Sequence, residues 1–222
     1  EKTGAGMMNC IKALTAANGD LEKAIEELRK SGIAKAEKKA SRSAKEGVVT
    51  AKIEGNTAIL LEVLCETDFV AKNDKFKAYV VEATERLMAA DGNGDLSESF
   101  AATEKDTIVS LIATIGENMQ ARRAAHWTSD GKFHSYLHMG GRVGVLVEAN
   151  ADADDDGLHD VCLHIAAFRP QYVKPEEVPA DLLEKEKEIA KAQLQGKPAE
   201  IMDKIVTGKI NKWYSEVCLN RQ

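Results

Sequence analysis

The spacing of apolar residues predicts short amphipathic helices over residues 1–45. Apolar positions there recur every three or four residues, the repeat that places side chains on one helix face. The two predicted faces consist of Met7, Cys10, Ile11 and Leu14, and of Leu21, Ala24, Ile25 and Leu28. Asn18 or Asp20 would cap the second helix, and Ser31–Gly32 would end it. With a third helix from residue 33 to about residue 44, we predict a compact three-helix bundle.

The pattern changes to strand-like runs at Val48–Glu54 and Thr57–Leu64. Gly55–Asn56 separates them, and a two-residue link of this type is typical of a β-hairpin. A helix from near Asp74 is predicted next, with an apolar stripe of Phe76, Tyr79, Val80, Ala83 and Leu87. A second helix is expected from about Thr103 to Ile115, where Gly116 would end it, and a strand over 119–125.

A similar order of elements recurs from Lys132 onward. Side chains over 133–138 alternate between two faces of a predicted strand, and Gly140–Gly141 turns the chain into a second strand at Val143–Glu148. An acidic loop and a helix over 158–167 follow. Three closing helices are predicted at 179–194, 199–206 and 209–217. The fold class we predict is α+β: a helical bundle (1–45), then a core of two related α+β subdomains (46–131 and 132–222) with antiparallel hairpins and flanking helices.

The composition is that of a globular protein that meets partners through specific patches. The chain has 222 residues, 44% of them hydrophobic, and a formal net charge of −6. A negative balance argues against direct nucleic-acid binding, because phosphate contacts need a dense basic surface. The basic run between Lys35 and Lys45 indicates a solvated face and a tether, with nucleic-acid contact as a minor alternative. No apolar run is long enough for a bilayer, and we expect no membrane association.

The cysteines favour a reducing compartment, because they are scattered without a C-x-x-C pair. They are Cys10, Cys65, Cys162 and Cys218. The start of the chain shows no secretory signal pattern. We expect a cytoplasmic protein, with an organelle matrix as the alternative.

Two loops and two histidines could suggest a metal site. The loop that begins at Asp152 has Leu163 where a calcium loop needs a bidentate Glu, and the loop that begins at Asp91 has Ala102 there. His134 and His138 share a strand face, but no recognisable third ligand accompanies them, so ordinary polar contacts are expected. Phosphate-loop, nucleophile-elbow and metalloprotease motifs are also missing. We predict no metal, no cofactor and no enzymatic activity of its own.

Asp68 and Phe69 stand side by side in a predicted polar loop between the first hairpin and the helix near Asp74. A large ring at a loop tip is unfavourable in water unless a partner receives it. Alternatively, the ring of Phe69 folds back into the protein's own core, where Phe is usually found. The residues alone favour this second reading.

The string Cys-Glu-Thr-Asp-Phe-Val-Ala-Lys-Asn-Asp-Lys-Phe, residues 65–76, resembles the signature loop of the bacterial elongation factor Ts family. That family exchanges guanine nucleotides on elongation factor Tu. Further motifs match in the same order, at residues 3–8, 17–20, 115–118, 141–147 and 196–198. The resemblance covers essentially the whole chain and is to a short form, without the coiled-coil insertion of long members.

The resemblance implies that the protein binds elongation factor Tu, nucleotide-free or GDP-bound, and promotes GDP release. Phe69 would insert between helices of the partner's GTP-binding domain and displace the elements that position Mg²⁺. Asp68 would contact polar groups beside that cleft. The bundle over 1–45 would resemble a ubiquitin-associated domain.

The resemblance also assigns lesser contacts to residues outside the Asp-Phe loop. His138 matches a histidine that packs near the phenylalanine, and Ile115 and Gly116 match a neighbouring contact point. Met7 and Met8 match an apolar pair that grips a partner helix, a role that suits methionine because it is adaptable. By periodicity alone, Met7 and Ile115 belong to the apolar stripes of their own helices.

Other functions are compatible with parts of the pattern. The protein could be a non-catalytic binding module or scaffold whose bundle captures a helix or a ubiquitin-like surface. It could also be a small-molecule or metal enzyme that uses its acidic loops and histidines. The apolar face of the last helix could pack within the chain or against a second copy, so a homodimer is possible; the face consists of Ile210, Trp213, Tyr214 and Val217.

Overall fold

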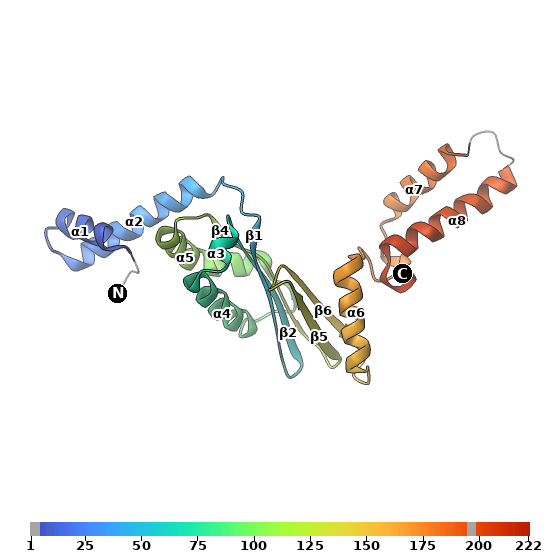
Figure 1. The fold of residues 1–222 in the computed structure, drawn as a ribbon, viewed down its shortest axis with the longest axis horizontal. Coiled ribbons are helices and arrows are strands. Elements are labelled where there is room, and N and C mark those ends of the chain that lie inside the picture. Colours follow the sequence, from blue (N-terminus) through green and yellow to red (C-terminus); the bar gives the residue numbers. More distant parts are fainter. Residues whose placement is uncertain (1–4, 195–198) are drawn as a thin grey trace. The chain divides into compact units, whose positions relative to one another are not determined.

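The computed structural model describes residues 5–194 and 199–222 and confirms the α+β class (Figure 1). The first and last of the matching motifs, at 3–8 and 196–198, lie partly or wholly outside the described residues. Packing divides the chain into two units, Glu1–Cys162 and Leu163–Gln222. The division into 1–45, 46–131 and 132–222 rests on sequence pattern and stays a prediction.

The first unit begins with two helices, α1 (Met7–Ala16) and α2 (Leu21–Lys39). Asp20 caps α2 as expected, because its Oδ1 accepts hydrogen bonds from the N–H groups of Glu22 and Lys23, both at 3.1 Å. The prediction of three helices is wrong for the described residues, because α2 continues through Ser31–Gly32. Gly32 is buried beside α5 (Ser97–Ile115), where an added Cβ would lie 3.4 Å from Ala113 Cβ, so this glycine permits close helix packing.

The predicted apolar face of α1 is only partly right, because Cys10 and Leu14 are half-buried but its other two residues are not. Met7 and Ile11 are exposed, and Ala13 is the residue of α1 that is buried. The reason is that α1 packs mainly on α2, so a short helix with one neighbour can cover only a narrow strip of its surface.

The main sheet is antiparallel, with strand order β1–β2–β4–β3. The four strands are β1 (Glu46–Glu54), β2 (Thr57–Cys65), β3 (Gly94–Asp95) and β4 (Met119–Thr128). The predicted hairpin is confirmed, and Gly55 adopts the positive φ of 59° that its tight turn requires. Ile59, Leu61 and Val63 alternate along β2 and are fully buried on one face.

Three helices cover that face: α3 (Asp68–Ala71), α4 (Asp74–Met88) and α5. The predicted stripe of α4 is confirmed, since its Phe76, Ala83 and Leu87 are fully buried. α5 begins at Ser97, earlier than the predicted Thr103. Asp95 Oδ1 accepts a hydrogen bond of 2.9 Å from Ser97 N–H just before the helix, and Phe100 in its first turn is buried.

The second hairpin, β5 (Lys132–His138) with β6 (Val143–Ala149), forms its own two-stranded sheet. Its turn lies on β1, because the N–H of Val49 donates to the carbonyl of Gly141 at 2.6 Å. Helix α6 (Asp155–Phe168) follows. Asp154 Oδ2 accepts from the N–H of Gly157 at 2.9 Å, so the acidic run that resembles a calcium loop starts a helix.

The second unit contains η1 (Pro175–Glu177), α7 (Ala180–Ala192), α8 (Ala199–Val217) and η2 (Leu219–Arg221). The predicted break near Gly208 is wrong, because α8 is continuous there. Ile210 packs with residues of α7, and Val217 packs with Val178, so this apolar face serves packing within the unit. No helix of the described chain is long and apolar enough to span a bilayer.

Candidate partner-binding site

Phe69 lies on α3, a single helical turn and not the loop that we predicted. Thr67 starts this turn: its Oγ1 accepts a hydrogen bond of 3.3 Å from the N–H of Val70. Consecutive residues of a helix point about 100° apart, so Val70 can be buried in the core while Phe69 points outward. The ring of Phe69 is 81% exposed, and the reading in which it folds back into its own core is wrong.

Asp68 is held one turn from Lys72, with 2.7 Å between the Asp68 Oδ2 and the Lys72 Nζ. This hydrogen bond is the main cause that lowers the pKa of the Asp68 carboxyl, and the charge of Arg142 lowers it further. Arg142 belongs to the turn of the second hairpin, where its N–H donates to the His138 carbonyl at 3.1 Å. Asp68 is therefore a fixed negative charge within the electrostatic reach of that turn.

His138 ends β5 and is exposed at the tip of the second hairpin. Its Nδ1 lies 2.8 Å from the hydroxyl of Tyr136. Leu137 and Met139 beside it are also exposed, so the tip presents a small apolar surface around the imidazole. His134, on the same strand, has a different partner, the ring nitrogen of His159 at 3.3 Å, and the expected ordinary polar contacts are confirmed for both histidines.

Ile115 and Gly116 form the C-terminal end of α5. Gly116 has a φ of 96° and its N–H donates to the Ile112 carbonyl at 2.9 Å, the geometry of a glycine cap. The Gly116 carbonyl accepts a hydrogen bond from Lys39 at the end of α2. Ile115 is half-buried and packs against the main core, as its own helix stripe predicted.

Met7 and Met8 are 77% and 63% exposed at the start of α1. Together with the exposed Ile11 they give α1 an apolar surface that the described chain does not cover. The extensive contacts of α1 are with α2, and none joins it to α3 or to the second hairpin. The structure thus brings Asp68 and the His138 turn into electrostatic reach, whereas the two methionines form a separate surface.

Four polar residues hold α3 on its core side: Glu66, Thr67, Glu117 and Asn118. They lie in the matching motifs, but sequence reasoning gave them no role. Glu117 accepts from the Thr67 N–H at 3.0 Å and from the Thr67 hydroxyl at 2.7 Å. Glu66 accepts from the Asn118 N–H at 2.6 Å. A threonine before Asp-Phe and a glutamate after a helix-ending glycine were the available signals, since both residue types cap backbone N–H groups.

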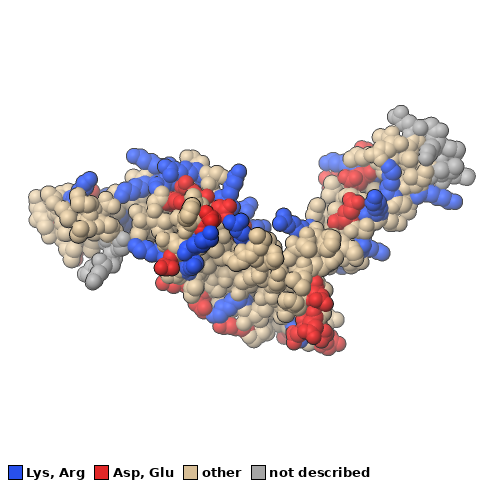
Figure 2. Space-filling model, in the orientation of Figure 1, with Lys and Arg blue, Asp and Glu red and all other residues tan. Residues whose placement is uncertain are grey.

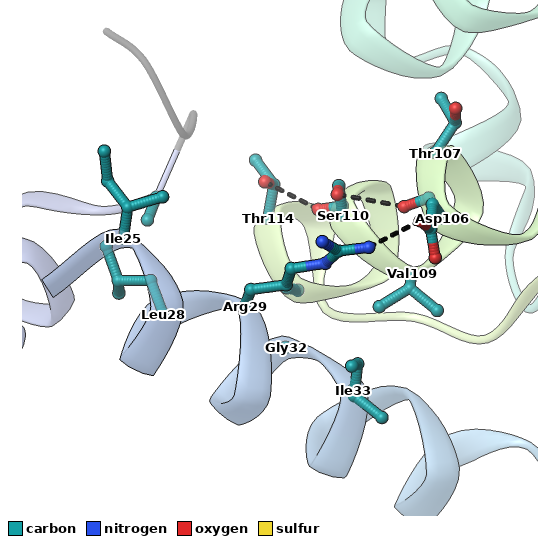
Figure 3. A pocket seen from close by; sticks show the side chains of 12 residues that line it. Ile25, Leu28, Arg29, Gly32, Ile33, Asp106, Thr107, Val109, Ser110 and Thr114 are labelled. Carbon is teal, nitrogen blue, oxygen red and sulfur yellow. Dashed lines mark hydrogen bonds and ion pairs between the residues drawn. The ribbon is translucent and has the colours of Figure 1, made fainter. Parts of the chain in front are cut away.

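The surface and its hollows do not suggest a second chemistry. Acidic side chains gather around the start of α6, while basic and acidic groups mix over much of the remaining visible face (Figure 2). A hollow of about 500 Å³ lies between α2 and α5, and its charged groups, Arg29 and Asp106, pair with each other at 2.7 Å (Figure 3). Among the described residues, no group of three or more His, Cys, Asp or Glu side chains could hold a metal ion.

The site thus consists of an exposed aromatic residue, Phe69, beside the carboxylate of Asp68, on a helical turn held by the core. The chain belongs to the elongation factor Ts family. The family model described as "Elongation factor TS" matches residues 66–222. The protein is therefore a translation elongation factor, with a role in protein biosynthesis.

Similar proteins cover the whole chain. Elongation factor Ts of Nautilia profundicola is 48% identical over an alignment of 238 residues, which spans 100% of this chain and 78% of the relative. Elongation factor Ts of Trichlorobacter lovleyi is 45% identical, over 99% of this chain and 77% of the relative. That of Cronobacter sakazakii is 46% identical, over 100% and 77%.

Proposed function

We propose that this protein is a guanine-nucleotide exchange factor that binds elongation factor Tu and accelerates GDP release. One observation carries the proposal: the 81% exposed ring of Phe69 on a capped turn whose next residue, Val70, is buried. Burial of that ring in an apolar cleft of a partner would contribute about 1.5–3 kcal/mol of binding free energy, relative to a ring that stays in water. Membership of the elongation factor Ts family supports the choice of partner.

The physical requirement on such a factor is thermodynamic linkage. If the factor weakens nucleotide binding by some ratio, the nucleotide must weaken binding of the factor by the same ratio. Each tenfold of mutual weakening corresponds to about 1.4 kcal/mol. The factor must therefore disturb what holds the nucleotide: Mg²⁺, the backbone N–H groups around the phosphates, and the base contacts. The reaction makes and breaks no covalent bond, so we do not class the protein as an enzyme.

We assign the wedge to Phe69, which would enter between helices of the partner's GTP-binding domain. Asp68 would orient it by contacts with polar groups at the cleft edge. His138 and its apolar neighbours would pack beside the inserted ring, with Ile115 and Gly116 as a neighbouring contact. Both α3 and the second hairpin pack against β1, which supports a single surface made by these elements.

The exposed Met7 and Met8 favour a second, compatible activity, in which α1 is a docking module that adds affinity. In the alternative function, a non-catalytic binding module or scaffold, the protein would bind its partner through this same surface of α1. The two functions separate in one experiment. Changing both methionines to alanine should weaken association with GDP-bound elongation factor Tu, while the release rate at saturating factor stays near that of the unchanged protein. A pure binding module would give no acceleration of release at any concentration.

The test of the main proposal is stopped-flow release of fluorescent GDP from elongation factor Tu. Phe69→Ala should slow release by about tenfold or more, because it removes the transfer free energy of the ring. Phe168→Ala is the matched control, since that ring is also a phenylalanine and is 65% exposed. Equal release rates for the two variants, with both proteins folded, would refute the wedge.

We further propose a cytoplasmic location, or an organelle matrix as the alternative, because the proposed partner works in translation. Direct nucleic-acid contact is not part of the proposal. A homodimer stays a prediction, and the packing of Ile210 and Val217 within the second unit leaves that face little free apolar surface for it.

A further inference from the structure

We propose that Glu117 is a positioning residue for Phe69: through Thr67 it holds α3 in the one conformation that presents the ring. This inference rests on the proposed exchange function and adds to it a residue that touches neither nucleotide nor wedge.

Both carboxylate oxygens of Glu117 are committed to a single residue. One accepts the Thr67 N–H at 3.0 Å, and the other accepts the Thr67 hydroxyl at 2.7 Å. Because the hydroxyl donates to Glu117, its lone pairs are free to accept the N–H of Val70 at 3.3 Å. Glu117 therefore sets the direction of the hydroxyl that caps α3.

The two segments hold each other reciprocally. Glu117 binds the backbone N–H of Thr67, and Glu66 binds the backbone N–H of Asn118 at 2.6 Å. Asn118 is only 2% exposed, and its side chain donates to the Arg42 carbonyl at 2.8 Å. The start of α3 is thus tied to the end of α5 and to the chain that follows α2.

This tie matters because α3 has only four residues. A single helical turn is not stable by itself, so its order must come from tertiary contacts. Without Glu117 the turn would sample other conformations. Only the fraction of molecules with the ring presented could act, and the apparent affinity would fall by that fraction.

The first test compares Glu117→Gln and Glu117→Ala in GDP release from elongation factor Tu. We expect Glu117→Ala to slow GDP release about tenfold. Glu117→Gln should slow it less, because the amide keeps an acceptor oxygen and the shape of the side chain. Glu148→Ala is the matched control, since Glu148 also accepts a hydrogen bond from a hydroxyl, that of Ser129, at the end of β6 away from the hairpin turn.

A double-variant cycle separates positioning from general damage. In a Phe69→Ala background, Glu117→Ala should slow release no further, because no ring remains to be positioned. A further tenfold loss in that background would show that Glu117 acts on the rest of the protein, and it would overturn the proposal.

A second readout needs no partner. Phe69→Trp places an indole on α3. Its fluorescence is obtained by subtracting that of the protein without this change, which contains only Trp127 and Trp213. Glu117→Ala should lower the fluorescence anisotropy of the indole and raise its quenching by acrylamide, with the Gln variant in between. Unchanged anisotropy in folded Ala and Gln variants would overturn the proposal. If the unchanged protein does not accelerate GDP release from elongation factor Tu, the proposed function is wrong. The anisotropy of the indole still decides whether Glu117 positions α3.

Discussion

Arg86 on α4 and Glu104 on α5 form a two-point ion pair, with Nε–Oε1 and Nη2–Oε2 distances of 2.7 Å each. Glu104 is only 1% exposed, whereas the side chain of Arg86 is 39% exposed. The pair joins the two long helices that cover the main sheet, near the end of α4 and within the first half of α5. If its partner were removed, the charge of Arg86 could be hydrated more easily than the charge of the buried Glu104.

Stability should respond unequally to removal of the two partners. Arg86→Ala leaves a buried carboxylate without its cation, and we expect a loss of about 3–5 kcal/mol. Glu104→Ala should cost less, because the guanidinium can turn to solvent. Urea unfolding of both variants measures the difference. A larger loss for Glu104→Ala would mean that the carboxylate, and not the guanidinium, is the group with access to water.

Thiol labelling should find one accessible cysteine in the folded protein. Cys10 is partly exposed, whereas Cys65, Cys162 and Cys218 are fully buried. Burial also raises the pKa of each of these three thiols, which lowers the fraction of reactive thiolate. Ellman's reagent should therefore react quickly with one thiol per chain and with four in guanidinium chloride. Cys10→Ser should abolish the fast reaction, and a fast reaction that survives this change would contradict the packing described.

Stability should fall at alkaline pH through Cys65. Burial raises its pKa from 9.0 to about 11, with the charge of Glu117 as a further cause. The folded state then binds more protons than the unfolded state between these values, so this contribution is complete below about pH 9 and is lost toward pH 11. The loss is at most about 3 kcal/mol. Cys65→Ala should flatten the fall in unfolding free energy over that range, and an equally steep fall in this variant would place the effect elsewhere.

Gly116→Ala should lower both stability and exchange. Gly116 has a φ of 96°, a region that costs a residue with a Cβ roughly 1–2 kcal/mol. Relief of that strain would shift the next residue, Glu117, which holds Thr67. Thermal unfolding and GDP release measure the two effects. An unchanged melting temperature would show that the turn tolerates a side chain, and any loss of exchange would then come from the proposed contact of Gly116 with the partner.

The elements with a strict local repeat could be predicted from the sequence. The hairpin around Gly55–Asn56 and the stripe of α4 were predicted because alternation and 3.6-residue spacing are written directly into neighbouring positions. Helix breaks were predicted poorly. Ser31–Gly32 and Gly208 lie inside continuous helices, since one glycine costs a helix only about 1 kcal/mol.

The candidate site was predicted in part. Phe69 and Asp68 were found through the resemblance, whereas their helical conformation depends on Thr67, which reads locally as an ordinary loop residue. The partner of Thr67 is Glu117, 50 positions away along the chain. No local pattern reports such a contact, because it exists only once the end of α5 has packed beside α3. Burial of Glu104 was missed for the same reason.

Photo-crosslinking from position 69 shows whether this residue enters the GTP-binding domain of elongation factor Tu. The Phe69 ring is replaced by p-benzoylphenylalanine, a close analogue, and the protein is irradiated with nucleotide-free elongation factor Tu; the same group at position 168 is the control. We expect a crosslink from position 69 to residues in the GTP-binding domain, and a weaker crosslink when the partner carries GDP. If the protein binds the partner but gives no crosslink from position 69, or gives one outside that domain, Phe69 is not the wedge.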